Sequence, residues 1–258
     1  MTADLSCENV SLTYGNGPVI EDLSVDLVRG AITVIVGPNA SGKSSLLRCL
    51  CRLQKPTHGR VLLDGQPIDS FSTREVAQRL AFLPQNTVAP RGMRVNELVL
   101  RGRTPYQSPL RQFTPEDQDI AAQAIAHVGL SAQADALLET ISGGQLQRAW
   151  IAMILAQDTG ILILDEPTTY LDLAHQREIL ELVRTLQRQR GLTVAMVLHD
   201  INLAARYADH ILALKDRGLA AAGPPETVVT EDNIARIFGL ACSVIEDPFN
   251  GTPHIILK

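Results

Sequence analysis

Short apolar runs recur along the chain, and glycine, proline, asparagine or aspartate bounds most of them, as is typical of buried strands. The most continuous runs are 32–36 (ITVIV), 160–164 (GILIL) and 193–198 (TVAMVL). Residues 174–190 lie between the last two runs, and their apolar positions repeat at helical spacing. Strands that alternate with helices in this way predict an α/β fold.

The start of the chain alternates loosely between apolar and polar positions over 5–10 and 12–14, turns at 15–18 (GNGP) and continues over 19–27. This pattern predicts a small antiparallel sheet that leads into the strand 32–36. The other expected elements are strands at 60–63, 80–83, 211–214 and 219–223 and helices at 72–79 and 231–238.

From residue 86 to about residue 158 helical periodicity dominates, as at Val95, Leu98 and Val99. We interpret this stretch as a helical lobe inserted into the α/β core. The predicted organisation is therefore a single domain, in which 1–85 and 159–258 form the core with its antiparallel subdomain and 86–158 forms the lobe.

Composition narrows the function. Among the 258 residues, 23 basic and 28 acidic side chains give a net charge of −5, which offers no electrostatic footprint for nucleic acid. The cysteines show neither a disulfide framework nor the spacing of a zinc site, which fits a reducing cytosol. The start of the chain lacks the pattern of a targeting segment, and no apolar run approaches the roughly 18 residues of a membrane span. We expect any membrane role to come through a partner.

The strand 32–36 is followed by GPNASGKSS, residues 37–45. The pattern G-x-x-x-x-G-K-[ST] is met by Gly37, Gly42, Lys43 and Ser44. In such a loop the backbone N–H groups wrap a phosphate, and the positive end of the following helix, expected from Lys43 to about Cys51, adds to the attraction. We expect Lys43 to reach the outer phosphates of a nucleoside triphosphate and Ser44 to ligate magnesium. The alternative is an ordinary corner of small residues.

Asp165 and Glu166 follow the buried run 160–164, at the strand end where an open α/β sheet places its ligand. Asp165 can hold magnesium and Glu166 can polarise an attacking water, whereas a plain surface turn is the alternative. Gln85 follows the strand 80–83, where its amide can ligate magnesium, orient a water or merely be solvated. His199 follows the strand 193–198, where it can contact a γ-phosphate or be structural.

Ser142 and Gln145 stand three residues apart before a helical pattern, which is the spacing of a capping box. Capping does not require the two glycines between them, which expose backbone donors suited to a second phosphate contact. Tyr14 can stack on a nucleobase or pack as an ordinary strand residue. Five arginines between Arg91 and Arg111 form either a solvated face or a docking surface.

Taken in order, several motifs together resemble the ATP-binding subunit of an ABC (ATP-binding cassette) transporter. They are GPNASGKSS, the glutamine after LAFLP, ISGGQLQR, ILILDEP, Tyr170-Leu171-Asp172 and His199. The resemblance covers nearly the whole chain. It implies a mixed α/β core, an inserted helical lobe that carries the SGGQ signature, and a head-to-tail homodimer with two ATP molecules at its interface. It also implies permease subunits in the membrane, an indirectly associated substrate-binding protein, and a location at the cytoplasmic face of the membrane.

The resemblance also implies a role for each candidate residue. Tyr14 would stack on adenine, and Glu166 would be the catalytic base, with His199 sensing the γ-phosphate. The phosphate contacts would come from Gly37, Pro38, Asn39, Ala40, Ser41, Gly42, Lys43, Ser44 and Ser45. The magnesium ligands would be Ser44, Gln85 and Asp165. The contacts to the other subunit's ATP would come from Ser142, Gly143, Gly144 and Gln145. Ile141, Ala40 and Ser45 depart from the commoner leucine, glycine and threonine without removing a group that the mechanism needs.

A narrower likeness comes from residues 101–106 (RGRTPY), 168–176 (TTYLDLAHQ) and the tail with Asp247-Pro248 and Gly251. These look like the importers of ferric siderophores, with haem and vitamin B12 importers as close relatives. The expected function is therefore ATP-driven uptake of a ferric siderophore. The alternatives are a haem or cobalamin importer, a non-transport cytosolic ABC ATPase, and a P-loop kinase or GTPase, which has no use for the SGGQ signature.

Overall fold

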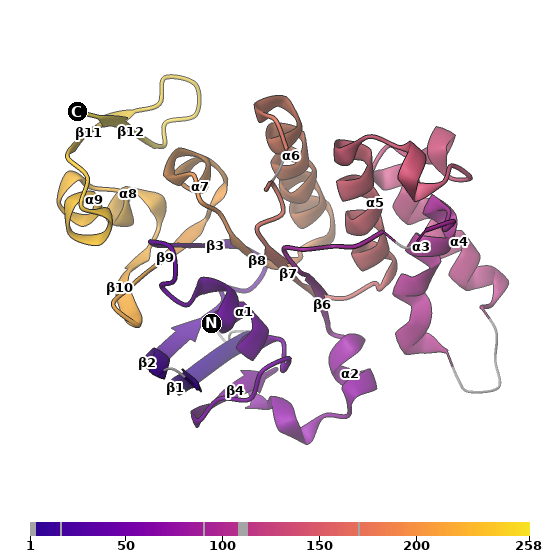
Figure 1. The fold of residues 1–258 in the computed structure, drawn as a ribbon, viewed down its shortest axis with the longest axis horizontal. Coiled ribbons are helices and arrows are strands. Elements are labelled where there is room, and N and C mark those ends of the chain that lie inside the picture. The colour runs from indigo at the N-terminus through magenta and orange to yellow at the C-terminus, as the bar shows by residue number, and fades with distance from the viewer. Residues whose placement is uncertain (1–3, 16, 90, 108–112, 170) are drawn as a thin grey trace. The chain divides into compact units, whose positions relative to one another are not determined.

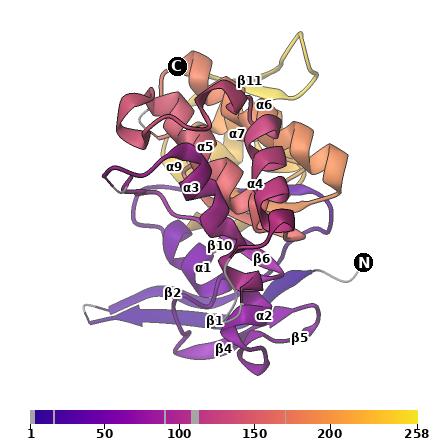
Figure 2. The ribbon, with the colours of Figure 1, turned by 90° about the vertical axis from the view of Figure 1, so that its right-hand side faces the viewer.

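The computed structural model describes residues 4–15, 17–89, 91–107, 113–169 and 171–258. The chain divides into two compact units, which we describe in turn. The first unit combines Met1–Ser70 with Leu186–Lys258, and the second is Phe71–Thr185. Figure 1 shows the chain from its indigo start to its yellow end, and Figure 2 shows it from the side.

The first unit contains the predicted antiparallel sheet, whose strands follow one another in the order β2-β1-β4-β5. The strands are β1 (Leu5–Tyr14), β2 (Gly17–Asp26), β4 (His58–Leu63) and β5 (Gln66–Pro67), with a 3-10 turn, η1 (Ile68–Ser70), after them. Leu12 and Ile20 are fully buried and lie opposite each other on β1 and β2. The loose alternation in the sequence thus places one apolar face of this sheet in the core.

A second set of strands in the first unit surrounds β3 (Ile32–Val36). It pairs in parallel with β8 (Thr193–Val197) on one side and β9 (His210–Lys215) on the other, and β10 (Gly218–Gly223) pairs antiparallel with β9. Every residue of β3 and β8 is buried, which explains why these strands are continuously apolar. The helices of this unit are α1 (Lys43–Leu50), α7 (Ile201–Tyr207), α8 (Pro225–Val228) and α9 (Glu231–Phe238).

The sequence did not predict the hairpin near the C-terminus. It consists of β11 (Cys242–Glu246) and β12 (Pro253–Leu257), yellow in Figure 1. The side chain of Asn202 holds β12 at Ile255: its amide donates to the carbonyl oxygen at 3.2 Å, and its own oxygen accepts from the N–H at 2.7 Å. This contact with α7 adds to the packing of a hairpin whose outer positions are half-buried or exposed and carry no clear alternating pattern.

The second unit pairs β6 (Leu80–Leu83) in parallel with β7 (Ile161–Asp165), and most of its other elements are helical. The remaining elements are α2 (Thr73–Ala77), α3 (Val95–Leu100), η2 (Arg101–Tyr106), α4 (Pro115–His127), η3 (Ser131–Gln133), η4 (Leu138–Thr140) and α5 (Gly143–Ala156). α3, α4 and α5 pack against one another, as Figure 2 shows. α6 (Leu173–Arg190) begins in the second unit and ends in the first.

The arginine-rich stretch is only partly exposed. For Arg103 both interpretations from the sequence, a solvated face and a docking surface, are therefore wrong. That side chain is 6% exposed; its Nε donates to Asp117 Oδ1 at 2.9 Å and its guanidinium lies 3.9 Å from the ring centre of Tyr106. Arg91, Arg94 and Arg101 are exposed, and Arg111 lies outside the described residues. The RGRTPY segment therefore ties η2 to α4, because a buried arginine requires its acidic partner.

Among the described residues, no helix is long and apolar enough to cross a membrane.

Candidate nucleotide site

The loop between β3 and α1 has the geometry that an anion cradle requires. Gly37 has φ 151°, and a Cβ built on it would lie 2.3 Å from the carbonyl oxygen of Leu214, so no other residue fits there. Gly42 ends the loop with φ 95°, and within the described structure no side chain caps the first turn of α1. A helix start without a side-chain cap can offer its backbone donors to a phosphate.

Lys43 folds back over this loop. Its Nζ donates to the carbonyl oxygens of Gly37 and Pro38, at 2.9 Å each, and the residue is 6% exposed. The ammonium is thus fixed at the loop, where a phosphate oxygen offers a stronger, charge-assisted partner than a neutral carbonyl. Ala40 adopts φ 63°, the left-handed region that favours glycine, so its departure from the family pattern carries a conformational cost.

Tyr14 is the last residue of β1 and is 42% exposed. Its hydroxyl donates to Ser45 Oγ at 3.4 Å and to the side-chain oxygen of Gln54. These bonds hold the ring beside the first turn of α1 and leave much of it accessible. The structure thus places Tyr14 next to the phosphate loop, and not in the core as an ordinary strand tyrosine.

His199 is exposed, two residues beyond the end of β8. β8 runs parallel to β3, with Ile35 opposite Val197 and the N–H of Leu198 donating to the carbonyl oxygen of Ile35 at 3.3 Å. Since the carboxyl ends of parallel strands meet at one edge, His199 and the phosphate loop leave the sheet on the same side. Its neighbour Asp200 caps α7 through the N–H of Leu203 at 3.0 Å.

In the second unit the structure brings Gln85 and Glu166 together. β6 and β7 pair with Leu83 opposite Leu164, and the amide of Gln85 donates to Glu166 Oε2 at 2.5 Å. The hydroxyl of Thr169 donates to the same oxygen at 2.9 Å. Glu166 also adopts φ 53°, a left-handed conformation in which the surrounding contacts hold it. This carboxylate is thus oriented by two neutral donors.

Asp165 is the last residue of β7 and only 1% exposed, which is not the environment of a surface turn. Within the described residues no cluster of three or more His, Cys, Asp or Glu could hold a metal. The candidate donors Ser44, Gln85 and Asp165 supply a single carboxylate. That donor set suits Mg²⁺, which keeps waters and takes phosphate oxygens as ligands, better than a metal caged by protein alone.

The signature segment begins α5 with the predicted capping box. Ser142 Oγ accepts from the N–H of Gln145 at 3.3 Å, and Gln145 Oε1 accepts from the N–H of Ser142 at 3.0 Å. Ser142 and Gly143 are exposed, while Gly144 is buried. The capping interpretation is therefore confirmed, and the exposed first residues remain available for a second role.

Two side chains near these groups were missed by the sequence reasoning. Thr169 stands three residues after Glu166, a spacing that brings a hydroxyl back to a carboxylate in a turn. His175 bonds to Asp172, and the signal that could have found it is an acid three residues before it at the start of a helix. Tyr170, named in the sequence pattern, lies outside the described residues.

A phosphate loop that follows a buried strand and opens a helix is typical of P-loop nucleotide hydrolases. Comparison with known proteins narrows this class. The family described as ABC transporter matches residues 20–169, and the chain belongs to it. The expectations of an ABC ATPase fold and of ATP hydrolysis are therefore confirmed, and ATP is the nucleotide that this family binds.

Three curated relatives match almost the whole chain. The ferric enterobactin transport ATP-binding protein FepC of Escherichia coli is 47% identical over 98% of this chain and 94% of its own length. The petrobactin import ATP-binding protein FpuD of Bacillus anthracis is 46% identical over 99% of this chain and 94% of its own length. The hemin import ATP-binding protein HmuV of Rhodococcus jostii is 37% identical over 98% of this chain and 85% of its own length.

Two solved structures share the fold. The inward-facing conformation of a protein described as a metal-chelate type ABC transporter has a TM-score of 0.87 at 26% identity, covering 100% of this chain and 98% of that one. A dimeric structure of a bacterial ABC transporter cassette has a TM-score of 0.74 at 28% identity, and the match covers 85% of this chain and 98% of that one. The narrower coverage of the second shows that the fold extends further in this chain than in that cassette.

Proposed function

We propose that this chain is the ATP-hydrolysing subunit of an importer that carries a ferric siderophore across the cytoplasmic membrane. The observation that carries the proposal is the near full-length similarity to ATP-binding proteins named for enterobactin and petrobactin transport, at 47% and 46% identity. The more distant hemin relative, at 37%, makes haem the next candidate, with cobalamin beside it. A non-transport ATPase is the alternative from another class.

Within this function Glu166 is the base. A water that attacks the γ-phosphorus of ATP gives its proton to the Glu166 carboxylate, which Gln85 and Thr169 orient through Oε2. The bond from the γ-phosphorus to the leaving oxygen breaks, and ADP and phosphate form. Lys43 and the backbone N–H groups of 37–45, which Pro38 lacks, bind the phosphates. Tyr14 stacks on adenine, and His199 contacts the γ-phosphate.

Magnesium, when bound by Ser44, Gln85 and Asp165, would neutralise charge on the phosphate oxygens. Support comes from the burial of Asp165 and from the Gln85 amide, which donates through nitrogen to Glu166 and so directs its oxygen to another partner. We further propose that Ser142, Gly143, Gly144 and Gln145 contact the ATP of a second copy in a head-to-tail homodimer. The exposure of Ser142 and Gly143 supports this.

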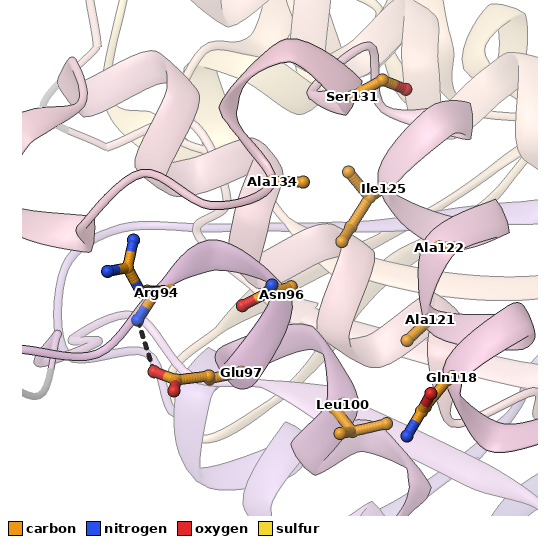
Figure 3. Close-up of a pocket in the computed structure, with 10 residues that line it drawn as sticks. All are labelled: Arg94, Asn96, Glu97, Leu100, Gln118, Ala121, Ala122, Ile125, Ser131 and Ala134. Carbon is orange, nitrogen blue, oxygen red and sulfur yellow. Dashed lines mark hydrogen bonds between the residues drawn. The ribbon is translucent and has the colours of Figure 1, made fainter. Parts of the chain in front are cut away.

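The helical lobe, 86–158, is our proposed docking region for permease subunits. These subunits would hold the chain at the cytoplasmic face of the membrane, and a substrate-binding protein would bind them on the opposite face. A pocket of about 550 Å³ supports this. Figure 3 shows Arg94 and Glu97 on one side of it and the apolar side chains of Ala121, Ala122 and Ile125 on α4 on the other. A pocket with charged side chains on one side and apolar side chains on the other suits a protein segment more than a metabolite.

Uptake measurements test the cargo. Cells that carry the Glu166→Gln allele should lose uptake of iron-labelled siderophores, while an allele with the exposed Glu226→Gln change should keep it. Labelled haem and cobalamin are measured beside them. Lost haem or cobalamin uptake with unchanged siderophore uptake would overturn the cargo and keep the importer. No change in any uptake, with lost ATPase activity in the purified chain, would favour the non-transport ATPase.

A further inference from the structure

The start of α6 and the start of α5 meet at a histidine. His175 is the third residue of α6, and its backbone N–H donates to Asp172 Oδ1 at 2.9 Å. Its ring Nδ1 lies 2.7 Å from the same oxygen. Because a carboxylate oxygen only accepts, Nδ1 carries the proton in this contact and the ring is fixed by two anchor points, its own backbone and Asp172.

The other edge of the ring lies against the signature segment. A Cβ built on Gly144 would stand 2.5 Å from His175 Cδ2, closer than real side chains approach, and 3.2 Å from Cγ and Nε2. Gly144 has no left-handed φ that would require glycine for another reason. The imidazole therefore occupies the space that any side chain at position 144 would need.

One turn further along both helices, Arg148 of α5 pairs with Glu178 of α6. The two helices are thus joined at consecutive turns, first by the imidazole edge on Gly144 and then by an ion pair that is partly exposed. An exposed ion pair adds little stability by itself. The contact nearest the signature residues is the one made by His175.

Helix capping alone does not explain why a histidine stands at position 175. An Asp at the cap position accepts from the backbone N–H of the third residue whatever side chain that residue carries. Histidine is also no better than an average helix former. The side chain of His175 instead makes two contacts that capping does not need, namely the Nδ1 bond to Asp172 and the packing on Gly144.

We propose that His175 is a positioning residue for ATP hydrolysis: it links Asp172 to Gly144 and so fixes the orientation in which Ser142 and Gly143 present their hydroxyl and amides. This rests on the proposed contact of the signature with the ATP of a second copy. The pKa of Asp172 is held low by the backbone N–H and then the ring of His175, so the carboxylate is ionised at neutral pH and the bond is charge-assisted.

Three substitutions at His175 separate the two contacts. In His175→Asn the amide nitrogen and oxygen stand where Nδ1 and Cδ2 stood, so the donor and the packing atom both remain. His175→Leu keeps atoms at both places but loses the donor, and His175→Ala loses both. We expect ATP turnover to fall about tenfold for Ala, since a misoriented contact commonly costs that much or more. The ATP turnover of His175→Leu should lie between that of His175→Ala and that of the wild type. The turnover of His175→Asn should be near that of the wild type.

The measurement is ATP turnover by the full-length chain beside equilibrium binding of labelled ATP and the thermal midpoint. Binding to the phosphate loop should stay within about twofold of wild type in all three variants, because the affected contact belongs to another copy's nucleotide. Wild-type turnover in His175→Ala overturns the proposal. So does an Asn variant as impaired as Ala at an unchanged midpoint, since it keeps both contacts.

A double-mutant cycle gives a second test. Gly144→Ala should be strongly impaired because its Cβ meets the ring, whereas Gly144→Ala with His175→Ala should turn over faster than Gly144→Ala alone, since the space is then open. Additive losses would overturn the contact. Glu166→Gln serves as the reference: if it hydrolyses ATP normally, the proposed function fails, whereas if only the His175 series behaves like wild type, this inference alone fails.

Discussion

The helices α1 and α5 both begin at glycine-containing turns assigned to phosphate contact, but their first turns differ. α1 starts at Gly42, and in the described structure no side chain caps it. α5 starts at Ser142, which forms a reciprocal box with Gln145. A phosphate at α1 meets a helix start without a competing side chain, whereas at α5 it must replace or share existing bonds. The comparison predicts a strong site at α1 and a conditional one at α5.

Removing the charge at the α1 site should have the largest effect. Lys43→Ala should lower ATP hydrolysis by at least about 100-fold and weaken nucleotide binding, because the charge-assisted contact to the outer phosphates is lost. The thermal midpoint should change little. The exposed Lys55→Ala variant is the matched control and should behave like the wild type. Near-normal hydrolysis in a folded Lys43→Ala protein would contradict the assignment of the loop.

The next largest effect is expected for a substitution of Glu166. It tests the starts of α1 and α5 together, because both are proposed to contact the same ATP in a dimer. Glu166→Gln should bind Mg-ATP and hydrolyse it roughly 100- to 10,000-fold more slowly, since a general base is lost. An ATP-bound dimer should then accumulate in size-exclusion chromatography, with the α1 site of one copy facing the α5 site of the other. Asp165→Asn should instead require more magnesium for turnover. A Glu166→Gln protein that stays monomeric with ATP counts against the arrangement.

Two changes at Ser142 separate capping from the proposed contact. Ser142→Arg should block hydrolysis while ATP binding to the same chain's loop stays intact. Ser142→Ala should lower the free energy of unfolding by about 1 kcal/mol, the usual value of a lost cap, and should also slow turnover. Ser72 forms the same box with Glu75 on α2, so Ser72→Ala is the matched control. An equal loss of turnover in Ser72→Ala would mean that capping alone explains the effect.

The smallest effect is expected at Ala40, inside the loop before α1. Its φ of 63° is unfavourable for alanine, so Ala40→Gly should raise the free energy of unfolding by roughly 0.5 kcal/mol, after the greater chain entropy of glycine is subtracted. Ala126→Gly, in the helix α4, should lower it by about 1 kcal/mol. Denaturant titration measures both. A loss of stability in Ala40→Gly would show that the loop relies on alanine.

The sequence predicted the elements with a continuous apolar run or a clear amphipathic pattern and missed those defined by particular contacts. The strand 80–83 and the helix 231–238 have the predicted bounds, because continuous burial or strong amphipathicity leaves a clear pattern. β11 and β12 were missed because Asn202, distant in sequence, holds them. Among candidate site residues, spacing in the sequence predicted the phosphate loop, and position after a buried strand predicted Glu166. Thr169 and His175 lie in the segment 168–176, but their contacts with Glu166 and Asp172 are visible only in the structure.

The partly buried RGRTPY segment bears on how cassettes and cargoes are matched. Gly102 and Arg103 are buried, and Tyr106 donates its hydroxyl to the carbonyl oxygen of Gln157 at 3.0 Å, so these residues maintain the interior of the lobe. Likeness in this segment thus traces common descent of the lobe and carries no information on which chelate is selected. We therefore expect the choice of chelate to depend on the proteins that bind the cassette, and not on the interior of its lobe.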